Sequence, residues 1–313
     1  MKRYLVTGGA GFIGSHIVRA LLERGESIRI LDNFSSGKHE NLEGLDAPNF
    51  KGRFEIVEGD LRDKQVIAQA VRDVDIIFHE AAFVSVPESM DKPQDCFDVN
   101  ITGTSNLFEA ARKAGVHRAV IASSAAVYGD STALPLDEDT DLGPLSPYAV
   151  SKRVDEMYAA LYTQSFGLEV TALRYFNVYG PRQRTDSMYA AAVPIFIHNM
   201  RTQRVVTVYG DGGQTRDLIY VGDVVRANLI ASEHPAAAGQ IFNICTGRET
   251  RLLDLLDELY KIFPNSSKPT FANSRDGDIY QSFGSPKKAE KILGFTAKKT
   301  LMEGLKETVE WYL

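Results

Sequence analysis

Hydrophobic and polar positions along the first half of the chain predict strands and helices that follow one another in turn. Apolar residues at positions 13, 17, 18, 21 and 22 fall on one face of a helix, directly after a short apolar run. Further short apolar runs predict strands, and longer periodic segments predict helices between them. We expect strands at Arg3–Thr7, Ser27–Leu31, Phe54–Val57, Asp75–His79, Arg118–Ala122 and Glu169–Arg174, and helices at Ile13–Glu23, Asp95–Lys113 and Tyr148–Gln164.

Strand–helix–strand units of this length favour a parallel sheet covered by helices on both faces. Because such crossovers are right-handed, the expected α/β fold is a Rossmann doubly wound parallel sheet. The pattern loosens after residue 175, with helices expected at Ala190–Thr202, Val221–Ser232, Leu252–Phe263 and Leu301–Trp311. We therefore expect a nucleotide-binding domain over residues 1–175, to which later segments return, and a smaller C-terminal α/β substrate lobe over residues 176–313.

Composition excludes several classes of protein. A chain of 313 residues with 44% hydrophobic and 24% charged residues can form a large core. Its net charge of −6, with no long basic run, argues against a nucleic-acid partner. The N-terminus runs straight into a strand and no apolar run reaches about 18 residues, so neither a signal peptide nor a membrane span is expected. Cys96 and Cys245 lack metal or dithiol spacing, so a cytoplasmic protein without a metal site is expected.

A glycine-rich loop joins the first strand to the first helix. Gly8, Gly11 and Gly14 stand in TGGAGFIG, where they follow a strand and open a helix, and Phe12 and Ile13 of the same motif are expected in the cofactor site. Such glycines permit a tight turn, close approach of a pyrophosphate and close packing of helix on strand. The N-terminus of the helix offers free N–H groups and a positive dipole end to phosphates. The loop therefore predicts a dinucleotide-binding site.

An acidic residue ends the second predicted strand. The Asp32 carboxylate can accept hydrogen bonds from both adenosine ribose hydroxyls, and it would repel a 2′-phosphate. NAD is therefore favoured over NADP. The alternative role for Asp32 is that of a cap in the turn that follows it. We expect the residues of this turn beside the adenosine: Asn33, Ser35, Ser36 and Gly37.

Tyr148 and Lys152 are four residues apart on a predicted helix, which places them on one face. A free tyrosine has a pKa of about 10 and is a poor base at neutral pH. A nearby ammonium and a cationic nicotinamide ring both favour the phenolate. The hydroxyl of Ser124, at the end of a strand, can bond the same substrate oxygen. Taken alone, such a pair is more often a solvated helix face; together with the nucleotide loop it predicts a catalytic triad.

These motifs together resemble the extended short-chain dehydrogenase/reductases, in their sugar-nucleotide epimerase and dehydratase branch. The resemblance covers nearly the whole chain: TGGAGFIG, GDL at 59–61, HEAA at 79–82, ASSAAVYG, YAVSK, RYFNVYGPRQ at 174–183 and YGDGGQTRDLIYV at 209–221. It implies NAD as the cofactor and Ser124, Tyr148 and Lys152 as the triad. It also implies further residues of the cofactor site. Asp60 and Leu61 are expected by the adenine, and Ala81 and Ala82 along the cofactor path. Asn100 is expected to support the active-site helices, and Tyr175 with Phe176 to lie near the nicotinamide.

The residues after Ser124 discriminate between the reactions of this branch. The related dehydratases carry an acid–base pair there, and the related decarboxylases carry a glutamate, whereas this chain has Ala125 and Ala126. Without those carboxyl groups, the expected reaction is epimerisation at C4 of a UDP-hexose such as UDP-glucose or UDP-galactose. Tyr148 would remove the proton of the 4-hydroxyl and C4 would give a hydride to NAD; the 4-keto sugar would turn, and the hydride would return to its other face.

The resemblance also implies the substrate contacts. Asn177, Arg216 and Arg275 are expected on the diphosphate, with Asp278 on the uridine ribose and Thr207 and Tyr209 near the uracil. Arg216 could instead pair with Asp217. Ser282 is small where relatives restricted to plain hexoses carry tyrosine, and Ser85 resembles the N-acetyl-tolerant members. UDP-GlcNAc and UDP-GalNAc are therefore further candidate substrates, and UDP-glucuronate stays open.

The helices near 95–113 and 148–164 carry apolar residues on more than one face, and in the resembling family such helices form a four-helix homodimer interface. Alternatively, both helices only pack on the sheet. Two other functions are open: a Rossmann protein that senses nucleotides without catalysis, and a dehydratase, net dehydrogenase or reductase. Retention of both Tyr148 and Lys152 argues against the non-catalytic alternative.

Overall fold

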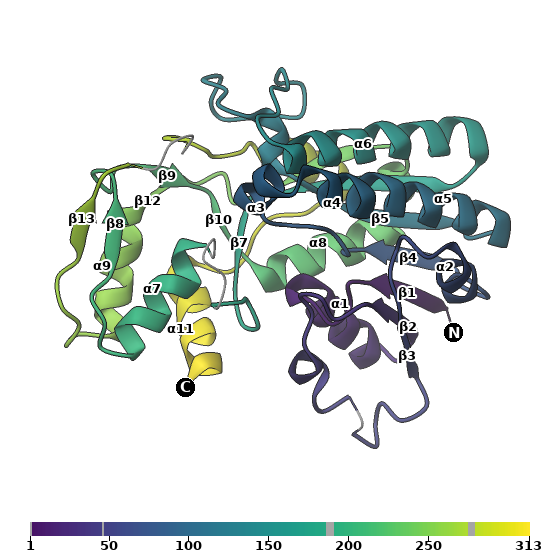
Figure 1. Ribbon diagram of the computed structural model, residues 1–313, viewed down its shortest axis with the longest axis horizontal. Coiled ribbons are helices and arrows are strands. Elements are labelled where there is room, and N and C mark those ends of the chain that lie inside the picture. Colours follow the sequence, from purple (N-terminus) through teal and green to yellow (C-terminus); the bar gives the residue numbers. More distant parts are fainter. Residues whose placement is uncertain (1, 46, 186–190, 275–278) are drawn as a thin grey trace.

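A parallel sheet forms the centre of the computed structural model, which describes residues 2–45, 47–185, 191–274 and 279–313. The sheet has seven strands in the order β11-β6-β5-β4-β1-β2-β3 (Figure 1). The strands are β1 (Arg3–Thr7), β2 (Ser27–Asp32), β3 (Phe54–Glu58), β4 (Ile76–His79), β5 (Arg118–Ser124), β6 (Glu169–Tyr175) and β11 (Ile241–Ile244). The strand order reverses between β1 and β4, which in a Rossmann fold opens a crevice for a dinucleotide. The expected fold class is confirmed.

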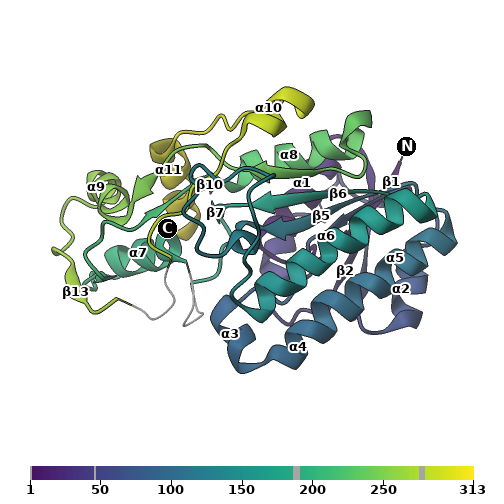
Figure 2. The same cartoon turned by 90° about the horizontal axis from the view of Figure 1, so that it is seen from above.

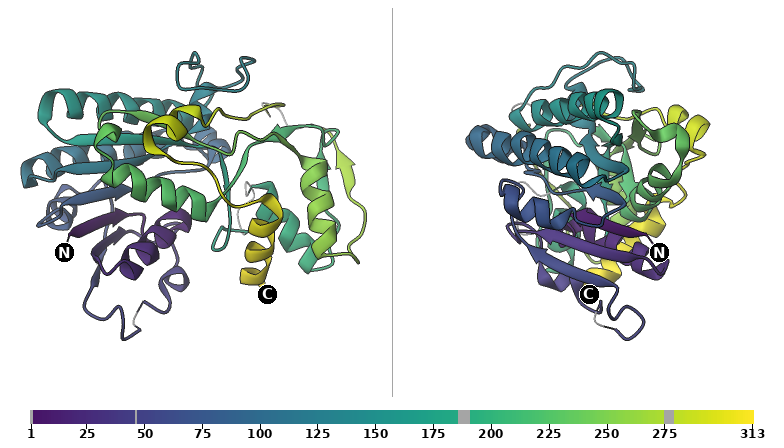
Figure 3. Two further views of the ribbon diagram at one scale, coloured as in Figure 1. Left: turned by 180° about the vertical axis from the view of Figure 1, so that it is seen from behind. Right: turned by 90° about the vertical axis from the view of Figure 1, so that its right-hand side faces the viewer.

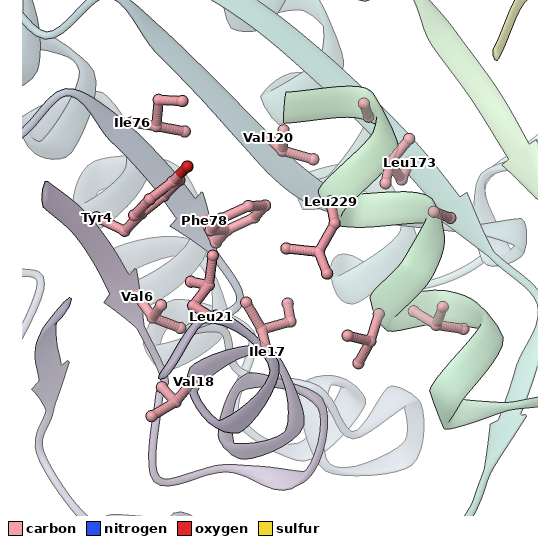
Figure 4. Close-up of a cluster of buried hydrophobic side chains, with 14 of the residues drawn as sticks. Tyr4, Val6, Ile17, Val18, Leu21, Ile76, Phe78, Val120, Leu173 and Leu229 are labelled. Atoms are coloured by element: carbon pink, nitrogen blue, oxygen red, sulfur yellow. The ribbon is translucent and has the colours of Figure 1, made fainter. Parts of the chain in front are cut away.

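Helices cover both faces of this sheet. One face carries α1 (Phe12–Glu23), α8 (Val221–Glu233) and α10 (Lys287–Leu293), and the other carries α2 (Lys64–Ala70), α5 (Gly103–Ala114) and α6 (Pro147–Phe166), on opposite sides in the right-hand view of Figure 3. Side chains alternate along a strand, so Tyr4 and Val6 of β1 meet α1 (Figure 4), whereas Leu5 points to the opposite layer. Each fully buried side chain of this size contributes roughly 1.5–3 kcal/mol.

A smaller lobe lies at the end of the sheet where β6 leads into β7 (Figure 2). Its core is formed by α7 (Ala192–Arg201), α9 (Leu252–Ile262) and α11 (Leu301–Tyr312) against the parallel pair β8 (Thr207–Tyr209) and β13 (Thr270–Ala272). Two further pairs connect it to the large sheet: β7 (Asn177–Tyr179) with β10 (Leu218–Tyr220), and β9 (Thr215–Arg216) with β12 (Thr250–Arg251). Between these elements, β11 joins the large sheet and α8 and α10 pack on one of its faces.

The helix expected at Asp95–Lys113 differs from the prediction. It consists of α4 (Pro93–Phe97), a π-helical turn at Asp98–Thr102 and α5. The wide turn contains Asn100, whose buried side chain accepts from Phe83 N–H (2.7 Å) and donates to Ser151 Oγ (2.8 Å). Such π-turns are frequent at functional sites.

The sequence pattern also missed several short elements. Among them are α2, α10, the sheet strand β11, α3 (Val86–Asp91), capped by Ser85, and the 3₁₀ turns η1 (His39–Leu42), η3 (Ala125–Tyr128) and η4 (Pro235–Ala237).

Candidate active site

The glycine loop forms a tight cradle at the carboxyl end of β1. A Cβ on Gly14 would lie 2.1 Å from Gly8 O, and one on Gly8, where φ is +67°, would lie 2.7 Å from Ala81 N. Gly11 caps α1 without any side-chain hydrogen bond, so the first N–H groups of the helix are not taken by a capping side chain. This cradle fits a pyrophosphate: Ala81, followed by Ala82, lies against Gly8, and Phe12 and Ile13 begin α1.

The Asp32 carboxylate is held by the backbone of the surrounding loops. Its side chain is 7% exposed, and it accepts from Ala10 N–H (2.9 Å) and Phe34 N–H (2.8 Å). Burial raises its pKa above the ordinary value, while the two N–H donors act in the opposite direction. A Cβ on Gly37 would lie 2.9 Å from both carboxylate oxygens. Asp32 thus organises the loop in addition to the role expected from the sequence.

The residues expected beside the adenosine are linked by hydrogen bonds. Asn33 donates to Asp60 (2.8 Å) and accepts from the hydroxyl of Ser35 (2.7 Å). The Arg62 guanidinium binds both oxygens of Asp60 at 2.8 Å and holds its pKa well below the usual range. Ser36 is exposed in the same loop, and Leu61 is buried beneath it.

Tyr148 and Lys152 lie in the first turns of α6, which begins at the cap Ser146. Ser124, the last residue of β5, is paired in register with Tyr175 at the end of β6 and accepts from Ala126 N–H (3.1 Å). Tyr148 lies within electrostatic reach of both Lys152 and Tyr175. The structure therefore brings Ser124, Tyr148 and Lys152 to the carboxyl edge of the sheet.

Lys152 is almost completely buried, with 3% of its side chain exposed. Burial alone would lower its pKa, but the attraction of Asp155, Tyr148 and Glu80 outweighs this effect and the pKa is raised. The ammonium therefore stays charged at neutral pH, as stabilisation of a phenolate requires.

A polar cluster lies at the ends of β4 and β6. The Tyr175 hydroxyl donates to Glu80 (2.8 Å) and accepts from Asn228 Nδ2 (2.7 Å). Burial raises the pKa of Glu80 to about 7, against the opposite effects of Tyr175 and Lys152. Sequence reasoning expected Tyr175 here but missed Glu80 and Asn228, although Glu80 lies within the HEAA motif.

Backbone pairing gathers several of the expected substrate residues. Asn177 N–H donates to Asp217 O, and Asp217 N–H donates to Ser282 O, both at 3.0 Å. Arg216 is therefore close to Asn177 and Ser282. The buried Asp217 carboxylate accepts hydrogen bonds from Thr246, Gly247 and Gly284. These contacts give Asp217 a structural role that differs from the pairing with Arg216 considered in the sequence analysis.

The remaining expected substrate residues are more dispersed. Thr207 and Tyr209 lie on β8 in the smaller lobe, beside β13. The Ser85 oxygen accepts from Glu88 N–H (3.2 Å) as the cap of α3. Arg275 and Asp278 lie outside the described residues. Among the described residues, no group of three His, Cys, Asp or Glu side chains could hold a metal ion, and none of the helices there has the length and apolarity needed to cross a bilayer.

A Rossmann sheet with a glycine cradle, an acid after β2 and a Ser–Tyr–Lys triad defines a dinucleotide-dependent short-chain dehydrogenase/reductase. Residues 4–245 match the NAD dependent epimerase/dehydratase family, and the chain belongs to that family. The chain is 41% identical over 309 residues to the putative UDP-glucose 4-epimerase of Methanocaldococcus jannaschii, covering 98% of this chain and 97% of that protein.

Two solved structures show the same fold. One is a UDP-N-acetylglucosamine 4-epimerase from Methanobrevibacter ruminantium with UDP-N-acetylmuramic acid (36% identity, TM-score 0.94). The other is the Thermotoga maritima UDP-glucose 4-epimerase with UDP-glucose (38% identity, TM-score 0.93). Each match covers 99% of this chain and 98% of the other. The interpretation of the chain as an NAD-dependent epimerase is confirmed.

Proposed function

We propose that the protein inverts C4 of a UDP-hexose through a transient 4-keto sugar. The observation that carries this proposal is the convergence of Tyr148 and the buried Lys152 from α6 with Ser124 from β5, at the sheet edge that also holds the glycine cradle. In this proposal residues 1–175 hold NAD and residues 176–313 mainly hold the UDP-sugar.

The side chains divide the chemistry between them. Tyr148, as the phenolate, takes the proton of the sugar 4-hydroxyl, the Lys152 ammonium stabilises that phenolate, and the Ser124 hydroxyl bonds the same oxygen. Bound NAD supplies the two-electron acceptor for C4. Ala125 and Ala126 carry no carboxyl group for the proton transfers of a dehydration. Reversal of these steps on the other face of the keto sugar inverts C4.

The proposed substrates are UDP-glucose and UDP-galactose together with their N-acetylated forms. The planar guanidinium of Arg216 suits a diphosphate because it makes two parallel hydrogen bonds. Ser282 is small and partly exposed and lies close to Arg216, which leaves room for an N-acetyl group. The similarity to a UDP-N-acetylglucosamine 4-epimerase supports this choice.

The test is separate incubation with UDP-glucose, UDP-GlcNAc and UDP-glucuronate, followed by NMR of the products. We expect inversion at C4 of at least one of the first two sugars with no net NADH.

Tyr148→Phe should reduce kcat by at least about 100-fold with NAD affinity unchanged, because the base is lost and the cradle is intact. Tyr158→Phe, the same change farther along α6, is the matched control and should keep wild-type activity.

Other products would replace the proposal with a different function. A stoichiometric requirement for added cofactor identifies a net dehydrogenase or reductase, and loss of water identifies a dehydratase. Inversion of UDP-glucuronate alone identifies a uronate epimerase. NAD binding without turnover of any of the three sugars would favour a nucleotide sensor.

We further propose that the enzyme is a cytoplasmic homodimer that acts in nucleotide-sugar and galactose metabolism. The two buried cysteines, Cys96 and Cys245, are both free thiols, which is usual in a reducing compartment. The dimer is supported by an apolar stripe on the outer side of α6, formed by Val150, Val154 and Met157 with Leu161 one turn farther on.

A further inference from the structure

The Lys152 ammonium has a buried acidic neighbour on its own helix. Its Nζ lies 3.4 Å from Asp155 Oδ2, and the two side chains are 3% and 2% exposed. Residues three apart on a helix share a face, so the contact follows directly from α6. A buried pair of charges is stable only when further hydrogen bonds satisfy the remaining polar atoms.

A chain of buried polar groups adjoins Asp155. Thr104 of α5 faces the Asp155 carboxylate and lowers its pKa. The Thr104 hydroxyl lies 2.9 Å from His79 Nε2, and His79 Nδ1 lies 2.7 Å from the Thr7 hydroxyl. Thr7 accepts in turn from Ala81 N–H (3.3 Å) and is the last residue before Gly8. The chain therefore connects Asp155 to the strand that carries the phosphate cradle.

The hydrogen-bond donors and acceptors along this row of side chains are consistent with one placement of the protons. A Thr104 hydroxyl that directs its proton to the carboxylate, as its effect on the pKa of Asp155 implies, accepts from His79 Nε2–H. His79 Nδ1 then carries no proton and accepts from Thr7. Burial and the charge of Lys152 lower the pKa of His79 to about 3, so the ring is neutral. Among these buried side chains, the negative charge is therefore carried by Asp155.

We propose that Asp155 is a positioning residue, which fixes Lys152 Nζ beside the active site and keeps it protonated, and which is itself anchored through Thr104, His79 and Thr7. The inference rests on the proposed function, because Lys152 acts there on Tyr148. Burial raises the pKa of Asp155 to about 6, against the effects of Lys152 and Thr104, so the carboxylate is charged at neutral and alkaline pH.

The other groups around Lys152 would remain after removal of Asp155. Tyr148 faces it from α6, Glu80 from the end of β4 and His79 from β4 itself, and the thiol of Cys96 faces it from α4. Glu156, next to Asp155, is held by Arg174 at 2.7 and 2.9 Å. Glu156 therefore does not replace Asp155, and loss of the Asp155 charge lowers the pKa of Lys152 although Tyr148 and Glu80 still attract the ammonium.

The test is the pH dependence of kcat in Asp155→Asn, which keeps the shape of the side chain and removes its charge. The alkaline limb of the profile, where Lys152 loses its proton, should move by about one pH unit or more toward lower pH. Asp91→Asn, at the exposed end of α3, is the control for one lost charge and should leave the profile in place. A lower kcat with an unmoved profile would show a merely structural role and overturn the proposal.

A stability cycle tests the pair independently of activity. Because Asp155→Asn leaves a buried ammonium unpaired, it should destabilise the protein more than the double variant Lys152→Met with Asp155→Asn, measured by urea unfolding. Equal or greater destabilisation in the double variant contradicts the proposal. Failure of the wild-type protein to invert any sugar would instead contradict the proposed function, and this cycle would still decide whether Asp155 acts on Lys152.

Discussion

At the scale of single residues, Glu80 combines a half-buried position with a charge that changes near neutral pH. Its carboxyl accepts from the Tyr175 hydroxyl and lies within electrostatic reach of Lys152. Burial nevertheless raises its pKa from 4.5 to about 7. The edge of the sheet beside Tyr175 and Lys152 therefore contains a group that is partly protonated near neutral pH.

We predict that Glu80→Gln removes part of the pH dependence of stability. The folded state holds this proton more tightly than the unfolded state, so the contribution of Glu80 to stability falls as pH rises from about 4.5 to about 7. The variant should therefore gain stability relative to the wild-type protein between pH 5 and pH 8, measured by urea unfolding of NAD-free protein. The exposed Glu310→Gln is the control. A difference between variant and wild type that is the same at both pH values would contradict the prediction.

At the scale of elements, β1, the glycine loop and α1 act as one rigid unit. The loop turns within a few residues because Gly8 adopts positive φ, and α1 approaches it so closely that Gly14 has no room for a side chain. Thr7, at the end of β1, joins the same unit to the buried chain behind Lys152. The proposed cofactor cradle and the proposed catalytic residue Lys152 thus share one support.

Gly14→Ala should damage that unit. The new Cβ would meet backbone atoms rather than a movable side chain, so we expect a loss of about 1–3 kcal/mol in stability and at least about tenfold weaker NAD binding. Thermal unfolding and titration with NAD measure the two effects. Gly143→Ala, whose Cβ would lie at an ordinary 3.7 Å from Tyr128 O, should leave both values unchanged. Wild-type stability and affinity in Gly14→Ala would show that the cradle is not the cofactor site.

At the scale of the whole molecule, α6 faces two environments. Its inner side carries Lys152 and Asp155 against the sheet, whereas its outer side exposes Val150, Met157 and Leu161. Figures 1 and 2 show α6 beside α5 along one side of the molecule. Exposed apolar side chains at helical spacing favour a symmetric helix pairing.

Leu161→Lys should therefore produce a monomer. At a two-fold interface the two introduced lysines would lie close together, and burial of two like charges opposes association. Light scattering coupled to size-exclusion chromatography measures the mass. Val205→Lys is the matched control, since Val205 is 44% exposed in the smaller lobe against 46% for Leu161. A monomeric wild-type protein, or a dimer in both variants, would exclude the α6 interface.

The fold and the family were predictable because they depend on local patterns. Short apolar runs predicted β1 to β6 but not β11, helical periodicity predicted α1 and α6, and glycine spacing predicted the cradle. The π-turn at Asp98–Thr102 was not predictable, because it depends on contacts of Asn100 with Phe83 and Ser151. The short strands of the smaller lobe also escaped prediction, since their pairing is non-local.

The sequence by itself determined the Rossmann architecture, the NAD-dependent family and the residue types of the proposed triad, since periodicity and motif spacing act over short stretches of chain. The tertiary structure alone decided which groups surround those residues. Asp155, Thr104 and His79 come from three elements, and only their burial in one layer turns an ordinary aspartate into a partner of Lys152. Desolvation is a property of the packed molecule, and no local pattern encodes it.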